Sequence, residues 1–182
     1  MRCPWADEAE PIYVAYHDNE WGKPTYDDQQ LFEMLCLEGA QAGLSWITIL
    51  KKRETYREVF DQFVAEKIIQ YDQQKINQLM KNPGIIRNRL KINAFICNAQ
   101  AYLTIRQKYG TFSSYIWSFV DGKPLINHWE TMEDVPTQTE RSNDMSKQLK
   151  KDGFKFVGPT ICYAFMQATG MVNDHLTSCK YK

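Results

Sequence analysis

Helical periodicity runs through almost the whole chain, whereas no segment shows the alternating pattern of a half-buried β-strand. We expect helices over residues 29–38, 45–50, 73–80, 88–108, 143–152 and 159–169. The segment 121–139 is polar and contains Pro124 and Pro136, so an irregular connection is expected there. The sequence therefore predicts an all-α fold, a compact bundle of short helices rather than a long coiled coil.

Local signals mark the ends of several of these helices. Side chains that favour N-caps precede three of them, at Asp27 or Asp28, Asp72 and Ser142. Pro159 suits the first turn of the last helix, and Gly170 follows its end in the position where a left-handed glycine is common.

The size and composition of the chain are those of an ordinary globular protein. Its 182 residues, 43% of them apolar, suit one domain over 1–182. No apolar run approaches the roughly 20 residues of a membrane helix, and the first residues lack the apolar stretch of a signal peptide. We therefore expect a cytoplasmic protein that does not enter membranes.

The five cysteines are an odd number, which argues against a disulfide framework in a reducing compartment. Cys36, Cys97 and Cys162 lie in apolar helical patterns and are expected to be core residues. Cys3 and Cys179 lie near the two ends of the chain instead, close to histidines.

Formal net charge is zero, which argues mildly against a nucleic-acid partner. The basic residues are nevertheless clustered at 51–53, 87–91 and 147–155. These clusters could form one basic face that neutralises a few phosphates, or they could be three solvated helix ends.

Glu38 is the residue of the first long helix that most needs an explanation. With about 100° between successive residues, Glu38 shares an apolar stripe with Leu31 and Leu35. A carboxylate there is costly unless it is paired or hydrogen-bonded. It could lie at a frayed helix end, pair with a basic side chain, or face a ligand.

Aromatic residues are dense near Glu38 in the sequence. They occur on both sides of the polar segment 16–22 and again after the small-residue run 39–43, as Trp5, Tyr13, Tyr16, Trp21 and Trp46. A carboxylate among aromatic rings suits a flat, cationic or NH-bearing ligand. An extruded nucleobase, a choline-like ligand and an ordinary aromatic core all fit this pattern.

Four residues could hold a metal ion: Cys3, His17, His175 and Cys179. The last two are four residues apart, which would place them on one face of a helical turn. Two cysteines and two histidines suit a closed tetrahedral zinc site, although the spacing is not that of a zinc finger. Such an ion would join the two ends of the chain.

These segments together resemble the 3-methyladenine DNA glycosylase I family. The matching stretches are YVAYHDNEWG (13–22), LFEMLCLEGAQAGLSWITILKKR (31–53), the region 84–99 around GIIRNRLKI, and GFKFVGPTICYAFMQATGMVNDH (153–175). They cover nearly the whole chain in order, and EWG and LEGAQAGLSW are specific to the family.

The resemblance implies a helix-hairpin-helix glycosylase fold, in which two helical subdomains enclose the base pocket. It implies a pocket formed by Glu38, Tyr16 and Trp46, with Tyr13, Trp21 and Trp5 nearby, and one structural zinc ion bound by Cys3, His17, His175 and Cys179. The segment between Trp5 and Pro11 is one residue longer than in comparable family members.

The resemblance also implies where DNA would be held. The hairpin 156–160, with Lys155, Phe156, Gly158 and Thr160, would contact the DNA backbone, and the next helix would offer N–H groups to a phosphate. Gly43 and Leu44 would enter the gap that the extruded nucleotide leaves.

The implied activity is hydrolytic removal of 3-methyladenine from double-stranded DNA by a monomer, which leaves an abasic site. Glu38 would accept hydrogen bonds from the adenine edge, Trp46 would stack on the base and Tyr16 would add a polar contact. Most helix-hairpin-helix glycosylases carry an aspartate after the hairpin helix, but this family lacks one in a working position, so Asp174 receives no such role.

Three other functions remain open from the sequence. A sensor that binds alkylated bases or damaged DNA without cleaving it would need the same pocket. A zinc hydrolase acting on small molecules would need an open metal position. A helical adaptor held by structural zinc would use the aromatic residues only as core.

Overall fold

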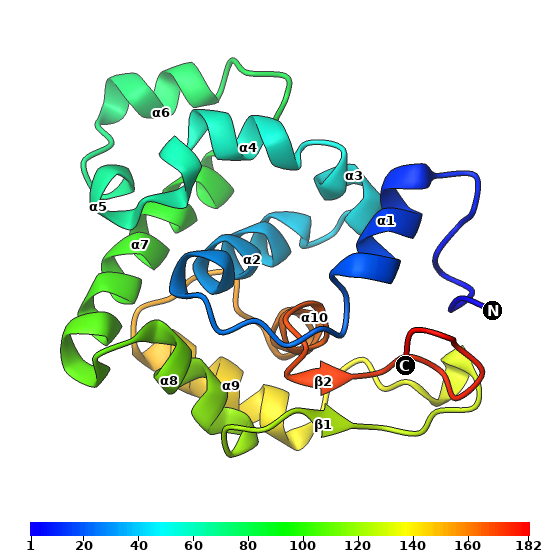
Figure 1. Ribbon diagram of the computed structural model, residues 1–182. Coiled ribbons are helices and arrows are strands. Elements are labelled where there is room, and N and C mark those ends of the chain that lie inside the picture. The colour runs from blue at the N-terminus through cyan, green and yellow to red at the C-terminus, as the bar shows by residue number, and fades with distance from the viewer.

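Helices dominate the computed structural model, which describes residues 1–182 (Figure 1). The α-helices are α1 (Pro11–Asn19), α2 (Asp28–Gln41), α3 (Trp46–Leu50), α4 (Arg53–Val59), α5 (Ala65–Ile68), α6 (Gln73–Leu79), α7 (Arg89–Tyr109), α8 (Phe112–Trp117), α9 (Glu140–Lys151) and α10 (Pro159–Ala168). Three short 3-10 helices are η1 (Asp61–Phe63), η2 (Ser118–Val120) and η3 (Met132–Asp134). The expectation of a mostly helical bundle is confirmed.

The one sheet is very small and lies in a part of the chain where no strand was expected. Strands β1 (Leu125–Ile126) and β2 (Val172–Asn173) pair in parallel, with Leu125 opposite Val172. Two residues are too few to show a period in the sequence, so this pairing depends on contacts made only in the folded chain. The rest of 121–139 is the expected irregular connection, apart from η3.

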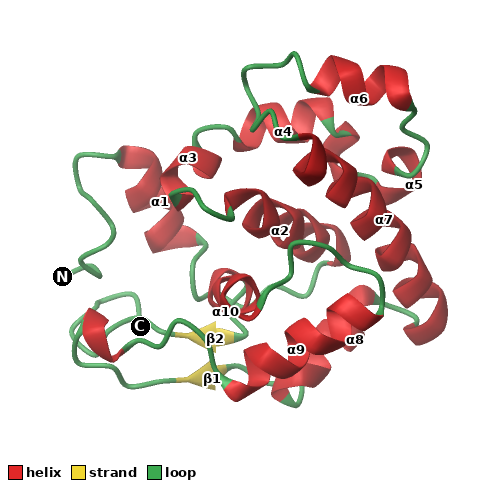
Figure 2. Cartoon of the chain, turned by 180° about the vertical axis from the view of Figure 1, so that it is seen from behind, coloured by secondary structure: helices red, strands yellow, loops and turns green.

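Helix α2 lies at the centre of the molecule, with helices on several sides of it (Figures 1 and 2). The Asp27 side chain accepts a hydrogen bond from the Gln30 backbone N–H at 2.8 Å, so the expected N-cap is confirmed. At the other end, the Lys91 ammonium donates to the carbonyl oxygens of Ala40 and Ala42 at 2.8 and 2.7 Å. Lys91 is therefore a buried residue that caps α2 and does not belong to an exposed basic face.

The expected start of α9 was wrong by three residues. Thr139 is the N-cap, and its hydroxyl accepts from the Ser142 backbone N–H at 3.3 Å. The Ser142 hydroxyl accepts in return from the Thr139 N–H at 2.8 Å. This reciprocal capping box needs a polar side chain three residues into the helix, and Ser142 fills that position.

The two ends of the chain lie on the same side of the molecule (Figure 1). The Lys180 backbone N–H donates to the Met1 carbonyl at 3.0 Å, and Cys3 and Cys179 are both buried.

Cys36 and Cys162 are core residues as expected, but Cys97 is exposed, because it lies on the outer face of α7. None of the helices combines the length and the apolar character that crossing a bilayer requires.

Candidate functional site

A cavity of about 310 Å³ brings together the six residues that the sequence placed in a pocket. They are Glu38 and the aromatic residues Trp5, Tyr13, Tyr16, Trp21 and Trp46. The residues come from α1, α2, α3 and the segments beside α1, so they meet only because these elements pack together.

The aromatic residues contact one another as well as the cavity. The Trp5 ring lies 5.0 Å from that of Tyr13 and 4.9 Å from that of Trp21, measured between centroids. Tyr16 and Trp46 lie 5.5 Å apart on α1 and α3. The buried indole N–H of Trp46 has no hydrogen-bond partner in the protein. The wall is therefore a set of mutually supporting rings, and the one donor without a partner is buried within it.

Glu38 is a buried carboxyl group that no protein group supplies with a hydrogen bond, and its residue is only 4% exposed. Burial raises its pKa from 4.5 to about 8, since removal from water disfavours the charged form. Burial of the Tyr16 hydroxyl, together with the nearby Glu38, raises the pKa of Tyr16 well above its ordinary value. Such a carboxyl group is ready to gain a partner that brings positive charge or N–H donors.

Six further residues line this cavity that the sequence did not single out. They are Gln41, Met132, Val135, Pro136, Ala164 and Gln167. Gln41 lies three residues after Glu38, so helical spacing could have indicated it. The residues of the 121–139 connection carried no such signal, because an irregular segment has no period.

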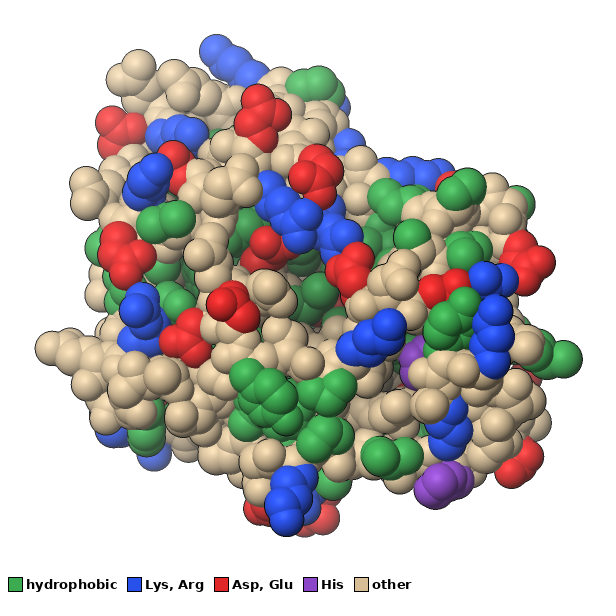
Figure 3. All heavy atoms as spheres, in the orientation of Figure 1, with side chains coloured by type: hydrophobic (Ala, Val, Ile, Leu, Met, Phe, Trp, Pro, Cys, Tyr) green, Lys and Arg blue, Asp and Glu red, His purple; other side chains and the backbone are tan.

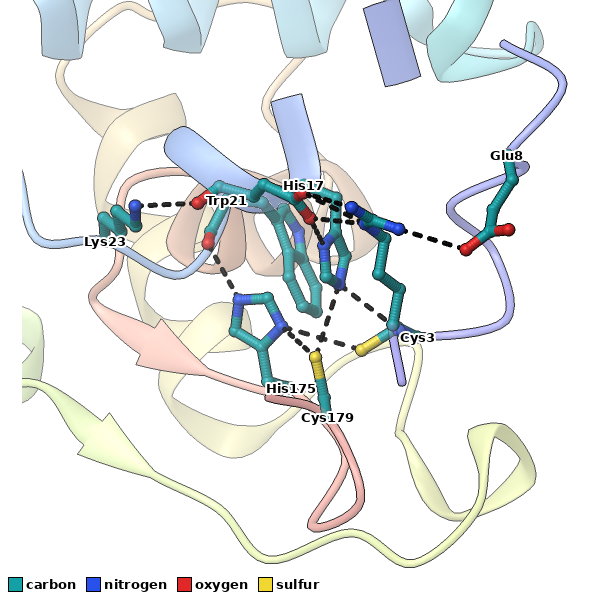
Figure 4. Close-up of polar contacts among 9 residues, drawn as sticks. Cys3, Glu8, His17, Trp21, Lys23, His175 and Cys179 are labelled. Carbon is teal, nitrogen blue, oxygen red and sulfur yellow. Dashed lines mark hydrogen bonds and ion pairs between the residues drawn. The ribbon is translucent and has the colours of Figure 1, made fainter. Parts of the chain in front are cut away.

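The four candidate metal ligands form a buried cluster in which all ligand atoms lie within 4.8 Å of one another. Figure 4 shows that the N-terminal segment, the end of α1 and the C-terminal segment each contribute to it. The Cys179 thiol lies 3.4 Å from His175 Nδ1 and 3.6 Å from His17 Nε2, and the Cys3 thiol lies 3.6 Å from His175 Nδ1.

His175 and Cys179 do not share a helical turn, contrary to expectation. The segment after β2 is a non-helical turn, closed by a hydrogen bond from the Cys179 N–H to the Leu176 carbonyl at 2.9 Å. This turn, and not a helical turn, brings the side chains of His175 and Cys179 together. The predicted proximity is therefore confirmed, and the predicted local structure is wrong.

Outer contacts orient both imidazoles (Figure 4). His17 Nδ1 lies 2.8 Å from the Asp18 carboxylate, and His175 Nε2 lies 3.0 Å from the Trp21 carbonyl. Both partners accept hydrogen bonds, so the other ring nitrogen of each histidine carries the lone pair that a metal ion needs. At His17 this lone pair accepts from the Cys3 backbone N–H at 3.3 Å. Burial lowers the pKa of His175 to about 4, which keeps that ring neutral.

The turn between α2 and α3 presents the predicted residues Gly43 and Leu44 at the surface. Gly43 has a φ of +77°, a left-handed conformation that favours glycine. The Leu44 N–H donates to the Gln41 carbonyl at 2.7 Å, and the Gln41 amide donates to the Leu44 carbonyl at 2.6 Å. This pair of hydrogen bonds holds an exposed leucine beside the cavity that Gln41 lines.

The segment between α9 and α10 and the first turn of α10 carry the other predicted DNA-contact residues. Lys155 and Thr160 are exposed, while Phe156 and Gly158 are partly buried. Gly158 is the N-cap of α10, and a side chain there would meet no atom within 4 Å. The Val157 carbonyl accepts from the Ser146 hydroxyl at 2.6 Å, which ties the segment to α9.

Basic and acidic side chains are interspersed on the face drawn in Figure 3. A second cavity, of about 490 Å³, contains the guanidinium groups of Arg53 and Arg57. Each is already paired with a carboxylate, Arg53 with Glu20 and Arg57 with Glu33. Lys23 also lines this cavity, and its ammonium donates to the Asp18 backbone carbonyl at 2.7 Å without a carboxylate partner. Neither arginine is therefore free to oppose the charge of a ligand.

Asp174 is a buried carboxylate that is fully occupied by the protein. Its Oδ1 accepts from the Asn127 amide and the Trp129 indole, each at 2.7 Å. Its Oδ2 accepts from the Tyr163 hydroxyl at 2.6 Å and the Gln167 amide at 2.8 Å. With four donors bound, this carboxylate has no free position from which to activate a water molecule.

Comparisons with known proteins match this chain to methyladenine glycosylases over nearly its whole length. A family model described as methyladenine glycosylase matches residues 5–182. The DNA-3-methyladenine glycosylase of Haemophilus influenzae is 54% identical over 181 residues, which are 100% of this chain and 97% of that protein.

Two solved structures have nearly the same fold. A crystal structure of 3-methyladenine DNA glycosylase I superposes with a TM-score of 0.97 at 53% identity, covering 99% of this chain and 98% of the other. A structure of 3-methyladenine DNA glycosylase I from Staphylococcus aureus, described as showing the basis of 3-methyladenine recognition, has a TM-score of 0.96 at 44% identity. It covers 100% and 96% of the two chains.

Proposed function

Because the chain belongs to the methyladenine glycosylase family, we propose that it removes 3-methyladenine from alkylated DNA by base excision. Its relatives are named for this activity, and they match over their full length at more than half identity. The substrate proposed here is double-stranded DNA, from which the damaged nucleotide is extruded into the cavity.

The observation that carries this proposal is that the Glu38 carboxyl group is buried without a hydrogen-bond donor from the protein. A buried carboxyl group without a protein donor lies among five aromatic residues in a cavity of about 310 Å³. N3-methylation gives the adenine ring of the nucleoside a positive charge, which this carboxyl group can oppose when ionised. Trp46 would stack on the ring, and the Tyr16 hydroxyl would supply a further polar contact.

Excision of 3-methyladenine requires little acid catalysis from the protein. Water forms a bond to the sugar C1′ as the bond from C1′ to N9 breaks. The electron pair of that bond stays with the base and cancels its positive charge, and the water gives its proton to solvent. The leaving base needs no proton, so the pocket has to extrude, recognise and orient it.

Glu38 is therefore proposed as a recognition residue and not as a dedicated general base. A cationic base would lower the pKa of Glu38 from its value of about 8 in the free pocket, and the ionised carboxylate would bind the charged base better than neutral adenine. Asp174 cannot take the role of a catalytic aspartate, because its lone pairs are occupied by four donors.

We further propose that the cluster of Cys3, His17, His175 and Cys179 binds one zinc ion. Zinc bonds of about 2.0–2.3 Å in a tetrahedron separate the ligand atoms by about 3.3–3.8 Å, which is close to the spacings between these thiols and imidazoles. Such an ion supplies structural cross-linking rather than catalysis, since four protein ligands leave no position for water.

DNA contacts are proposed at two places. Leu44, exposed on its hydrogen-bonded turn, would fill the gap left by the extruded nucleotide. The segment 156–160, as the hairpin of a helix-hairpin-helix fold, would meet the DNA backbone together with Lys155, where open space at Gly158 and the N-terminus of α10 allow a phosphate to approach. A monomer, a cytoplasmic location and two helical subdomains around the pocket stay predictions.

Assaying base release from methylated DNA tests the function directly. Wild-type protein should release free 3-methyladenine, and E38Q should release it much more slowly, because the amide keeps the shape of the side chain but not its charge. Binding of methylated DNA without any released base would support a sensor instead. Full release by E38Q would show that Glu38 is not the recognition residue.

A further inference from the structure

Gln167 is held at both its backbone and its side chain while it lines the same cavity as Glu38. Its carbonyl accepts from the Gly22 N–H at 2.9 Å and the Gly170 N–H at 3.2 Å. Its side-chain Nε2 donates to Asp174 Oδ2 at 2.8 Å. A glutamine on a helix surface usually samples several rotamers, so this degree of restraint is notable in a pocket wall.

Asp174 decides which way the Gln167 amide faces. A carboxylate has lone pairs but no proton, so only the NH₂ side of the amide can meet it. Turning the amide over would place Gln167 Oε1 against a carboxylate oxygen. Asp174 is 1% exposed, so water could not relieve that repulsion. The orientation is therefore fixed by chemistry and does not depend on telling oxygen from nitrogen.

The remaining amide atom, Gln167 Oε1, accepts no hydrogen bond from the protein, whereas Nε2 is engaged by Asp174. Because the side chain lines the cavity, this oxygen is the group left to face a ligand. We propose that Gln167 is a specificity-determining residue, whose Oε1 accepts a hydrogen bond from an N–H group of the extruded base. This inference rests on the proposed excision of 3-methyladenine.

An oriented acceptor would favour an adenine-type base over a guanine-type base. At the C6 position, 3-methyladenine carries an amine that can donate, whereas 3-methylguanine carries a carbonyl oxygen that can only accept. Two acceptors facing each other in a desolvated pocket are left unpaired. A site built around one hydrogen bond rejects a partner of the wrong kind strongly, by about tenfold or more.

The hydrogen bonds of Asp174 also predict what happens when the Gln167 amide is turned so that a donor replaces the acceptor in the cavity. In D174N the new amide has one oxygen and one NH₂ group. The Trp129 indole can only donate, so the oxygen of the new amide must stay on the side of Trp129. Its NH₂ group then faces Gln167, whose amide must turn to present its own oxygen. The NH₂ group of Gln167 would then face the cavity and favour a carbonyl-bearing base.

The experiment measures the release of 3-methyladenine and 3-methylguanine from the same methylated DNA. Q167M keeps the length of the side chain and its helical propensity but removes the acceptor. It should lower the ratio of 3-methyladenine to 3-methylguanine release by about tenfold. D174N should lower the ratio further, because it presents a donor.

Gln148 provides the matched control. Its amide donates to Asp152 at 2.9 Å, and Asp152 also accepts from the Tyr115 hydroxyl at 2.6 Å, so the chemistry is the same at a place outside the cavity. Q148M should leave the ratio at the wild-type value. An unchanged ratio in folded Q167M or in folded D174N would overturn the inference, whereas a wild-type protein that releases no base would refute the proposed function itself.

Discussion

The Arg53 guanidinium donates to both carboxylate oxygens of Glu20, at 2.6 and 2.8 Å, and so joins the start of α4 to the end of α1. The side chain of Arg53 is 14% exposed and that of Glu20 is 38% exposed. Helix α1 carries Tyr13 and Tyr16. Helix α3, which carries Trp46, ends shortly before α4 begins at Arg53. The ion pair therefore fixes the distance between two walls of the pocket.

Replacing Glu20 should weaken the contact between α1 and α4. In E20Q the nearly buried Arg53 loses its charged partner, so we expect the free energy of unfolding to fall by about 1–3 kcal/mol. We also expect weaker binding of free 3-methyladenine. The Lys51–Glu10 pair joins α1 to the end of α3 in the same way but is exposed, so E10Q should cost at most about 1 kcal/mol. Urea unfolding of both variants makes the comparison, and equal losses would contradict it.

The raised pKa of Glu38 predicts a pH-dependent stability. Between the ordinary pKa of 4.5 and about 8, the folded protein keeps a proton that the unfolded chain has released. Stability therefore falls as the pH rises through this range, and E38Q removes the effect. Thermal unfolding between about pH 5 and pH 8 should show that E38Q becomes progressively more stable than wild type. A constant difference would mean that the Glu38 pKa is not raised.

The same group predicts the pH dependence of excision. Glu38 must lose its proton to oppose a cationic base, and binding has to supply that deprotonation at pH values below about 8. The specificity constant of wild type should therefore increase as the pH approaches 8, while the residual activity of E38Q should lack this increase. Base release under single-turnover conditions over that range measures both profiles.

The sequence predicted most of what helical periodicity can encode. Leu31, Leu35 and Glu38 share a buried face as the spacing indicated, because α2 is long and regular. Gln167 was missed, since a polar residue on a helix usually faces water and its partner Asp174 lies beyond the end of that helix. Contacts between segments that are distant in the chain leave no local pattern.

The same limit explains the errors in local structure. His175 and Cys179 were correctly paired, but four-residue spacing is compatible with a helical turn and with the tighter turn observed. The apolar neighbours of Cys97 indicate a core residue, yet Cys97 is exposed on α7. The basic residues beside Lys91 in the sequence indicate a surface position, whereas its long side chain reaches buried carbonyl oxygens at the end of α2.

Cys179 tests the proposed zinc site. C179S should lose bound zinc and lower the midpoint of thermal unfolding by several degrees, because the metal joins the two ends of the chain. C97S removes an exposed cysteine outside the cluster and should change neither zinc content nor stability. Metal analysis and differential scanning calorimetry provide the readouts, and a wild-type protein purified without zinc would refute the site.

Trp46 tests the proposed stacking on the base. W46A should weaken the binding of free 3-methyladenine by about 1–3 kcal/mol, the scale of base–aromatic stacking. W46F keeps an aromatic face but presents a smaller ring to the base. Its loss of affinity should be smaller than that of W46A, because part of the stacking remains. Titration calorimetry determines both values, and unchanged affinity in W46A would remove Trp46 from the base contacts.

Leu44 should matter for extrusion of the base and not for recognition of the free base. It is 37% exposed on the turn that Gln41 holds, and it lines no part of the cavity. L44A should lower excision from duplex DNA by about tenfold or more, because unstacking a base costs a few kcal/mol that an inserted side chain offsets. Its affinity for free 3-methyladenine should stay at the wild-type value. Leu90, 70% exposed on α7, gives the matched variant L90A, which should excise normally. Equal loss of free-base binding and excision in L44A would place Leu44 in the pocket wall instead.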